Sequence, residues 1–147
     1  DVRVDLAHVN TPGVLDTCAI AKKPVFCTHT GCRALNDHPR NITDEEIDAI
    51  ASTGGVIGII FGPFFLAGKM FAPSDCVLDH VEYVVDRVGI EHVALGSDFD
   101  GWLATIPNDM KDCRDVIKIL DGLKRRGFTG DQIEAITHEN ALRVLRG

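Results

Sequence analysis

The sequence predicts an α/β protein built on a parallel sheet. Four short runs of apolar residues each precede a segment with helical periodicity, and the runs are apolar nearly throughout instead of alternating with polar residues. Parallel neighbours need a crossover connection, usually a helix, and such helices cover the sheet, so its strands are apolar on both faces. A chain of 147 residues with 45% hydrophobic content suffices for one ordinary core, so we expect a single domain, 1–147.

The first two predicted strands each end at a histidine. Residues 2–6 alternate like a strand that leads to His8, and Thr11-Pro12-Gly13 then opens a helix with proline in its first turn. Residues 24–28 form a second apolar run that ends at His29. Each histidine therefore stands at the carboxyl end of its predicted strand.

The next helix and strand have clear boundaries. Thr43 and Glu46 have the spacing of a capping box, in which the hydroxyl and the carboxylate each accept a hydrogen bond from a free backbone N–H. Gly54-Gly55 ends this helix, and the β-rich residues 56–61 follow as the third strand. This segment completes the second unit and begins the third.

The remaining residues predict the fourth strand and the closing helices. Ser74 is expected to cap a helix that Gly89 ends, and residues 92–97 form a fourth apolar run that stops at Asp98. Three further helical segments are predicted at 112–126, 130–137 and 139–145.

Doubly wound sheets and (β/α)8 barrels both fit four such units. Neither a G-x-G-x-x-G motif nor a Walker loop follows any strand, which removes the usual support for a nucleotide-binding sheet. Successive strands are separated by roughly the 30 residues that one unit of a barrel occupies. The spacing therefore favours a barrel.

Composition excludes several classes of partner. The net charge of −7 disfavours nucleic acid and anionic membrane surfaces, because phosphate binding needs a basic face. The first residues are charged where a signal peptide would be apolar, and no apolar run approaches the ~18 residues of a membrane span. Five cysteines without a C-x-x-C motif predict neither a disulfide framework nor a zinc knuckle, so we expect a reducing, cytoplasmic location.

Three of the four strands end in a side chain that can bind a metal, namely His8, His29 and Asp98. The carboxyl ends of barrel strands meet on one face, and that face holds the active site. Imidazole and carboxylate suit Zn²⁺, and an open coordination position would lower the pKa of bound water to about 7. The pattern predicts a divalent-metal site.

Five blocks along nearly the whole chain resemble, in order, the C-terminal half of the membrane dipeptidase (renal dipeptidase) family. The resemblance implies the C-terminal half of a (β/α)8 TIM-type barrel, four βα units plus closing helices, in an amidohydrolase-like enzyme. It also implies hydrolysis of dipeptides at a binuclear zinc site. The blocks are Asp5-Leu6-Ala7-His8, Thr28-His29-Thr30, His38-Pro39-Arg40-Asn41-Ile42-Thr43-Asp44, Gly54-Gly55-Val56-Ile57-Gly58 and Gly96-Ser97-Asp98-Phe99-Asp100-Gly101.

The resemblance also implies a role for individual residues. His8 and His29 would be the two imidazole ligands of one zinc, and Arg40 would bind the terminal carboxylate of the substrate, which its planar fork of donors suits. Asp98 would take a proton from the metal-bound hydroxide and pass it to the leaving amine. Asn41 would help to shape the substrate pocket.

The chain departs from the family pattern in two ways. Ala7, Thr28 and Thr30 stand where the family usually has serine, from which we expect tuned metal binding. The H-x-D pair, the bridging glutamate and a substrate-contacting histidine of the family have no counterpart. We therefore expect at most one loosely held zinc and no activity from this chain alone, with the dipeptidase being a parent protein of about twice the length.

Two other functions fit parts of the pattern. A half barrel without catalysis would leave two sheet edges open, which favours self-association or pairing with the missing N-terminal half. A different metal-dependent amidohydrolase would share the metal residues but would not explain Arg40-Asn41.

Several residues compete with the predicted site residues. Asp100 is the competitor of Asp98, which is nearer to the strand end. Cys27 beside His29 is interpreted as a buried small side chain, and Asn41-Ile42-Thr43 matches a glycosylation sequon, although Thr43 already has a capping role. Surface or capping positions are expected for the other histidines, His38, His80, His92 and His138.

Overall fold

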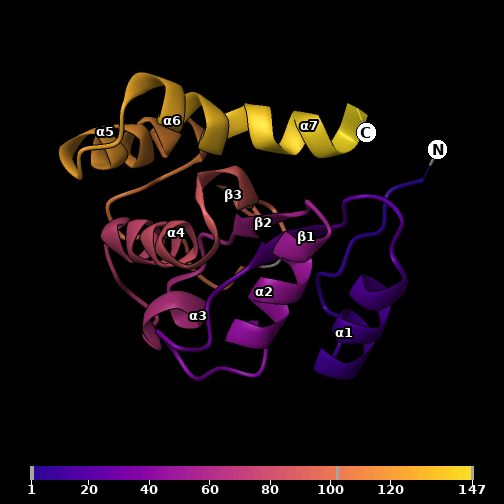
Figure 1. Ribbon diagram of the computed structural model, residues 1–147. Helices are drawn as coiled ribbons and strands as arrows, with labels where there is room; N and C mark the ends of the chain where they lie inside the picture. Colours follow the sequence, from indigo (N-terminus) through magenta and orange to yellow (C-terminus); the bar gives the residue numbers. More distant parts are fainter. Residues whose placement is uncertain (1, 102, 147) are drawn as a thin grey trace.

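The computed structural model describes residues 2–101 and 103–146. Strands alternate with helices in the first two thirds, and helices alone follow (Figure 1). The elements are α1 (Thr11–Ile20), β1 (Phe26–Thr30), α2 (Asp44–Ser52), β2 (Val56–Ile59), α3 (Pro63–Ala67), α4 (Asp75–Val88), the turn η1 (Ile90–His92), β3 (Val93–Leu95), the turn η2 (Cys113–Val116), α5 (Ile117–Arg125), α6 (Gly130–Glu134), the π-helical turn η3 (Ala135–Glu139) and α7 (Asn140–Arg146).

The three strands form a parallel sheet in the order β1-β2-β3. The predicted first strand was only partly right, because residues 2–6 join the edge of β1 through a single parallel bridge between Asp5 and Phe26. Two backbone hydrogen bonds hold this segment, from Leu6 N–H to Phe26 O at 2.7 Å and from Phe26 N–H to Val4 O at 2.8 Å. The segment nevertheless runs parallel to β1, so both carboxyl ends point to the same edge.

Helices cover the two faces of the sheet unequally. One face carries Cys27, Ile57 and Val93 into the main core, which the apolar sides of α2 and α4 complete. The other face carries Phe26, Val56 and Ala94, and a separate small cluster joins these to Val144 of α7. In Figure 1 helices α1, α2 and α3 lie lower than the sheet, α4 lies to its left, and α5, α6 and α7 run along the top of the view.

Helix starts follow the local sequence in one case and tertiary contacts in another. Thr43 and Glu46 form the predicted capping box at the start of α2. Ser74 was predicted to cap α4 and does not, because its N–H and its hydroxyl both donate to the Asp109 carboxylate, at 2.8 and 2.6 Å. Helix α3 was not predicted, and the two C-terminal segments join through the π-helical turn into one run.

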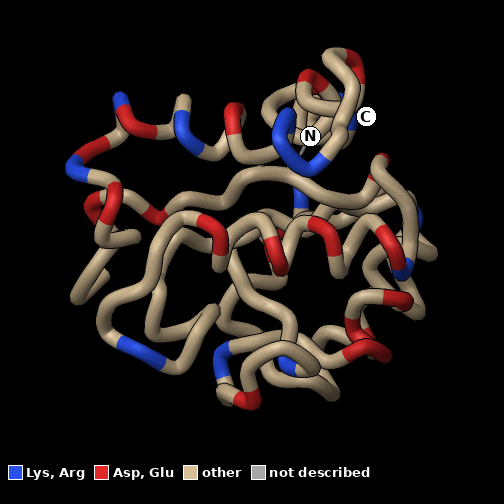
Figure 2. Tube along the Cα trace, turned by 90° about the vertical axis from the view of Figure 1, so that its left-hand side faces the viewer, with Lys and Arg blue, Asp and Glu red and all other residues tan. Residues whose placement is uncertain are grey.

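Charged residues of both signs are distributed over the surface. Lys and Arg residues are scattered among Asp and Glu residues along the trace (Figure 2). Across residues 2–101 and 103–146, no helix combines the length and the apolar character that a membrane crossing requires.

Candidate metal and substrate site

Two predicted ligands meet at the carboxyl edge of the sheet. The Nε2 atoms of His8 and His29 are 2.9 Å apart, and the ring centroids are 4.9 Å apart with an interplanar angle of 62°. Zn–N bonds are about 2.0–2.1 Å long, so two nitrogens on one ion must lie roughly 3–3.5 Å apart. The pair is therefore close to the separation that one shared ion needs.

A bulge in β1 helps to aim His29. The register of β1 against β2 shifts between Cys27 and Thr30, so Thr28 and His29 leave the regular alternation. A bulge of this kind redirects a side chain next to a site. It also brings the Thr28 carbonyl against two glycines, since a Cβ at Gly58 or at Gly96 would lie 2.1 Å from that oxygen. The role of these glycines was not predicted, although glycine inside an apolar strand signals such a close approach.

Asp5 connects the two histidine-bearing segments. Its Oδ1 accepts the backbone N–H groups of Ala7 and Thr28, each at 3.0 Å, and its Oδ2 accepts the Thr28 hydroxyl at 2.8 Å. Burial alone would raise the pKa of Asp5, but the hydrogen bonds from Ala7 and Thr28 outweigh burial and lower it. This role of Asp5 was not predicted, although Asp5 opens the first family-like block.

The environment of His29 favours the neutral imidazole. Burial lowers its pKa, the Asp98 carboxylate opposes this effect, and the positive charge of Arg40 and the neighbouring His8 lower the pKa further. A metal binds the neutral form of histidine, so the net lowering favours ligation near neutral pH.

Arg40 and Asn41 lie beside the histidines. One guanidinium nitrogen of Arg40, Nη2, donates to the carbonyl of His29 at 2.8 Å. A cavity of about 290 Å³ has His8, Arg40 and Asn41 in its wall. Asn41 is buried and donates to the carbonyls of Asn36 and Phe65, at 2.9 and 2.7 Å, so it ties its loop to α3. Its role in shaping a substrate pocket stays a prediction.

Backbone strain gathers at the same edge. Over the described ranges, the non-glycine residues with positive φ are His8 at 68°, Asp98 at 60° and Asp100 at 61°. Left-handed backbone is uncommon outside glycine and tends to cluster at functional sites. Two residues spaced as Asp98 and Asp100 would point to the same side of a strand. Both lie beyond the end of β3, so this rule does not apply to them.

Asp98 does not join the histidines as a third ligand. Within residues 2–101 and 103–146, no group of three or more His, Cys, Asp or Glu side chains is arranged to hold a metal ion. The roles that the resemblance implies, with His8 and His29 as metal ligands and Asp98 as the proton carrier, stay a prediction. Asp98 lies beyond the end of β3, and its negative charge acts on His29 by raising the pKa of the imidazole.

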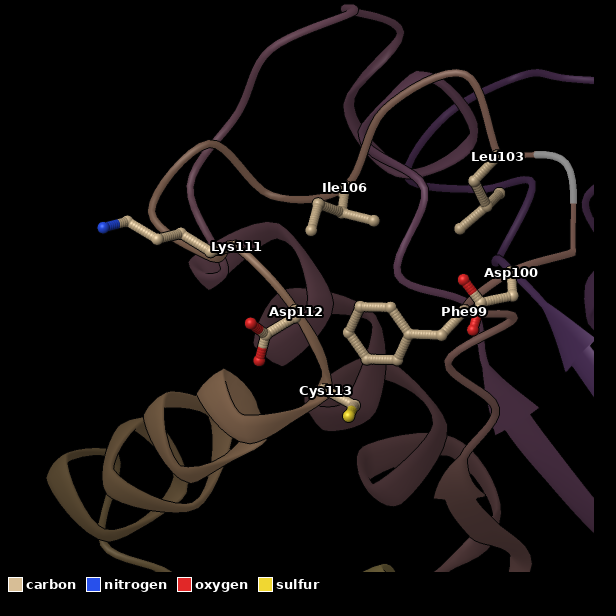
Figure 3. A pocket seen from close by; sticks show the side chains of 7 residues that line it. All are labelled: Phe99, Asp100, Leu103, Ile106, Lys111, Asp112 and Cys113. Atoms are coloured by element: carbon tan, nitrogen blue, oxygen red, sulfur yellow. The ribbon is translucent and has the colours of Figure 1, made fainter.

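A second cavity of about 430 Å³ has Phe99 and Asp100, the two residues after Asp98, in its wall (Figure 3). Phe99, Leu103 and Ile106 line it with apolar surface, and Lys111 and Asp112 bring charge to it from the segment before α5. In Figure 3 Asp100 lies on the side of the strands, and Lys111 and Asp112 lie on the opposite side of the cavity.

The competing residues have structural roles. His80 was predicted at a surface or capping position, and this was wrong: the side chain is 1% exposed, accepts the Cys32 N–H on Nδ1 at 2.8 Å and lies 3.0 Å from Leu66 O through Nε2. Cys27 is buried as predicted, and burial raises its pKa to about 12, which rules out a nucleophilic thiolate. The other histidines lie at or near the surface: His92 is partly buried with Nδ1 2.8 Å from Gly55 O, His138 is exposed, and His38 packs on Phe64 and Phe65.

A parallel α/β sheet with polar, strained residues at its carboxyl edge defines the class, and comparison with known proteins defines the family. The membrane dipeptidase family (peptidase family M19) matches over residues 1–147, and the chain belongs to this family.

Curated relatives extend well beyond the segment that this chain matches. An uncharacterized protein in the pqqA 5′ region of Klebsiella pneumoniae is 34% identical over 99% of this chain and 54% of its own length. Dipeptidase verJ of Clonostachys rogersoniana is 34% identical over 97% of this chain and 36% of its length. The chain therefore spans between about a third and a half of these relatives.

Solved structures share the fold. A metallopeptidase of the same family, dipeptidase AC, superposes with a TM-score of 0.90 at 32% identity, over 97% of this chain and 43% of that one. A metallopeptidase from Rhodobacter sphaeroides, crystallised with a phosphinate mimic of the dipeptide L-Ala-D-Ala, gives a TM-score of 0.89 at 30% identity, over 97% and 41%.

Proposed function

We propose that this chain is the C-terminal half of a (β/α)8 barrel in a zinc-dependent dipeptidase and that it supplies one half of a binuclear site. The observation that carries the proposal is the 2.9 Å approach of His8 Nε2 and His29 Nε2 at the carboxyl edge of a parallel sheet. The remaining ligands would come from the part of the relatives that this chain does not span.

Each residue of the site has a distinct task in this proposal. His8 and His29 hold one zinc, and Arg40 binds the terminal carboxylate of a dipeptide at the 290 Å³ cavity. Asp98 accepts the proton of the attacking water and returns it to the leaving amine. When bound, zinc polarises the peptide carbonyl and acidifies water. The L-Ala-D-Ala mimic bound by the Rhodobacter relative supports a small dipeptide as substrate.

Zinc titration of the purified chain tests the ligand assignment. We expect one weak site by calorimetry that His8→Ala or His29→Ala abolishes, and the matched variant His138→Ala, which removes an exposed histidine, leaves it unchanged. Zinc binding that survives both site variants would refute the assignment.

Hydrolysis of Ala-D-Ala tests the division into two halves. We expect no hydrolysis by the chain with zinc, and hydrolysis once the chain is joined to the N-terminal part of the Rhodobacter relative. Asp98→Ala should abolish the activity of the joined protein. Zinc-dependent hydrolysis by the chain alone that disappears in Asp98→Ala would show instead that the chain is a sufficient enzyme.

The exposed apolar edge favours pairing with the rest of a barrel. Val2 and Ile20 are 89% and 80% exposed, and both line a groove of about 310 Å³ beside the bridge at Asp5. An uncovered edge next to exposed apolar side chains favours association. The chain covers 41–54% of its structural and bacterial relatives cited above, so we propose the remaining part of the barrel as the occupant. We expect the remaining part of the barrel, added as a separate polypeptide, to form a 1:1 complex with this chain, measured by light scattering. Val2→Lys should weaken the complex. A chain that stays monomeric in the presence of that polypeptide contradicts this proposal.

A further inference from the structure

One carboxylate reaches both histidine-bearing segments. Asp5 Oδ1 accepts the N–H of Ala7, the residue before His8, at 3.0 Å. Asp5 Oδ2 accepts the hydroxyl of Thr28 at 2.8 Å, and the same hydroxyl oxygen lies 3.0 Å from Nδ1 of His29. The three side chains thus form a continuous chain of hydrogen bonds that ends on the back of the His29 ring.

The direction of these hydrogen bonds follows from the number of protons available. An ionised carboxylate can only accept, so Thr28 must donate its single hydroxyl proton to Asp5. The Thr28 oxygen can then only accept from His29, which places the ring proton of His29 on Nδ1. Nε2 is left with a lone pair, and Nε2 is the atom that faces His8 at 2.9 Å.

The contacts recorded for the neighbours Thr30 and Arg40 differ from this arrangement. Thr30, on the other side of His29, directs its hydroxyl toward the carbonyls of Gly31 and Arg40, each at 3.2 Å. The carbonyl of His29, and not its ring, accepts from Arg40. The orientation of the His29 ring therefore rests on Thr28, and that of Thr28 rests on Asp5.

We propose that Asp5 and Thr28 are positioning residues that fix His29 as its Nδ1–H tautomer and present Nε2 to a metal, while Asp5 also anchors the backbone that leads to His8. Groups that bind the far nitrogen of a ligating histidine set its tautomer and its metal affinity. The inference rests on the proposed function only for the identity of what Nε2 binds, because the tautomer is a property of the chain itself.

Nitrogen-15 NMR of the imidazole rings, recorded without metal at pH 8, reads the tautomer directly. Two other histidines serve as internal references. His92 must carry its proton on Nδ1, which donates to the Gly55 carbonyl, and His80 must carry it on Nε2, which donates to the Leu66 carbonyl. We expect the His29 signals to match the pattern of His92 in the wild type and in Thr28→Ser, which keeps the hydroxyl.

Asp5→Asn gives the sharpest contrast, because it is isosteric and reverses one hydrogen bond. The amide oxygen can replace Oδ1 toward the backbone N–H groups, and the amide nitrogen then donates to the Thr28 oxygen. The hydroxyl proton is then free to turn to His29 Nδ1, so we expect the His29 signals to shift toward the pattern of His80. Zinc affinity should fall by about 10–100-fold, as for other partners of metal-bound histidines, and Thr28→Ser should retain it.

Thr28→Val removes the hydroxyl at nearly constant volume and should give a mixture of tautomers. If Thr28→Val does not fold, Asp5→Asn still decides the matter. Two results overturn the proposed chain of hydrogen bonds from Asp5 through Thr28 to His29. In one, the nitrogen-15 signals of His29 in the wild type resemble those of His80; in the other, they do not change in Asp5→Asn. If His29→Ala abolishes zinc binding and Asp5→Asn leaves the zinc affinity unchanged, Asp5 has no role in metal binding. The proposed function stands in that case. In a further outcome, the His29 tautomer responds to Asp5→Asn while zinc binding survives His29→Ala. That result would support the chain of hydrogen bonds from Asp5 to His29 and would refute His29 as a metal ligand.

Discussion

The amino and carboxyl ends of the parallel strands use their polar side chains differently. At the amino ends, Asn140 of α7 donates to the carbonyls of Ile90 and Val93, each at 2.8 Å, and Arg143 donates to those of Gly54 and Glu91, each at 2.7 Å. Every one of these bonds satisfies backbone just before or at the start of a strand, and Val144, the residue after Arg143, is fully buried.

At the carboxyl ends, polar side chains face one another or solvent, and the backbone is strained. His8 and Asp98 have left-handed φ angles, and His8 Nε2 lies 2.9 Å from His29 Nε2. In barrels the face at the amino ends serves stability and the face at the carboxyl ends serves chemistry. The contrast teaches that substitutions at the two ends should separate stability from metal binding.

Gly58→Ala should have the largest effect and should damage both properties. The new Cβ would lie 2.1 Å from the Thr28 carbonyl, a backbone atom that cannot move without shifting the bulge that carries His29. We expect a loss of about 2–3 kcal/mol in the free energy of unfolding from urea denaturation and at least a tenfold loss in zinc affinity. Gly130→Ala, where the structure offers open space, is the control and should be neutral. A Gly58→Ala chain with unchanged zinc affinity would contradict the close-approach argument.

Asn140→Ala tests the amino end alone. Two buried carbonyls, those of Ile90 and Val93, would lose their donor, which costs about 1–3 kcal/mol. Urea denaturation should show this loss, and calorimetry should show unchanged zinc affinity, because the site is at the opposite end of the strands. The exposed Asn108→Ala is the matched control. A parallel fall in zinc affinity would mean that the two ends are coupled.

His80 should make stability depend on pH. Burial lowers its pKa, while the hydrogen bond to the Leu66 carbonyl and the charge of Asp79 oppose burial only in part. A histidine with a lowered folded pKa binds fewer protons when folded, so its contribution is complete above the ordinary value of about 6.5 and is lost as pH falls through the folded value. The wild type should therefore lose stability between pH 7 and pH 5.

His80→Gln isolates this effect. Glutamine can offer an acceptor and a donor but does not titrate, so we expect a chain less stable by about 1–2 kcal/mol at pH 7 with a smaller fall toward pH 5. Urea midpoints at both pH values measure the difference, with the exposed His138→Gln as control. An unchanged pH dependence in His80→Gln would assign the effect to other groups.

Asp100→Gly should give the smallest effect, with the opposite sign. The φ angle of 61° at Asp100 is easier for glycine, although glycine also loses more chain entropy on folding, so a net gain of about 0.5 kcal/mol is expected. In the zinc-loaded enzyme joined to its N-terminal half, activity should survive Asp100→Gly and not Asp98→Ala. Loss of activity in Asp100→Gly would make Asp100 the proton carrier.

Much of the fold could be predicted from sequence because its signals are local. The strand–helix order, the parallel direction and the capping box of Thr43 with Glu46 were confirmed. Each depends on residues within one or two turns of one another, or on an apolar run long enough to need two covered faces. The strand ends also located His8, His29 and Asp98 at one edge, since parallel strands share a direction.

Other features were decided by contacts between distant segments. The pairing of His8 with His29 joins residues 21 positions apart, and the bond from Cys32 to the buried His80 joins residues 48 positions apart. The bulge at Thr28, the hydrogen bonds of Asp5 and the diversion of Ser74 to Asp109 also depend on segments that meet only in the folded chain. The sequence by itself determined the order of the strands and helices and the parallel direction of the sheet. Only the tertiary structure decided which side chains touch, because hydrogen bonding and burial depend on distance in space and not along the chain.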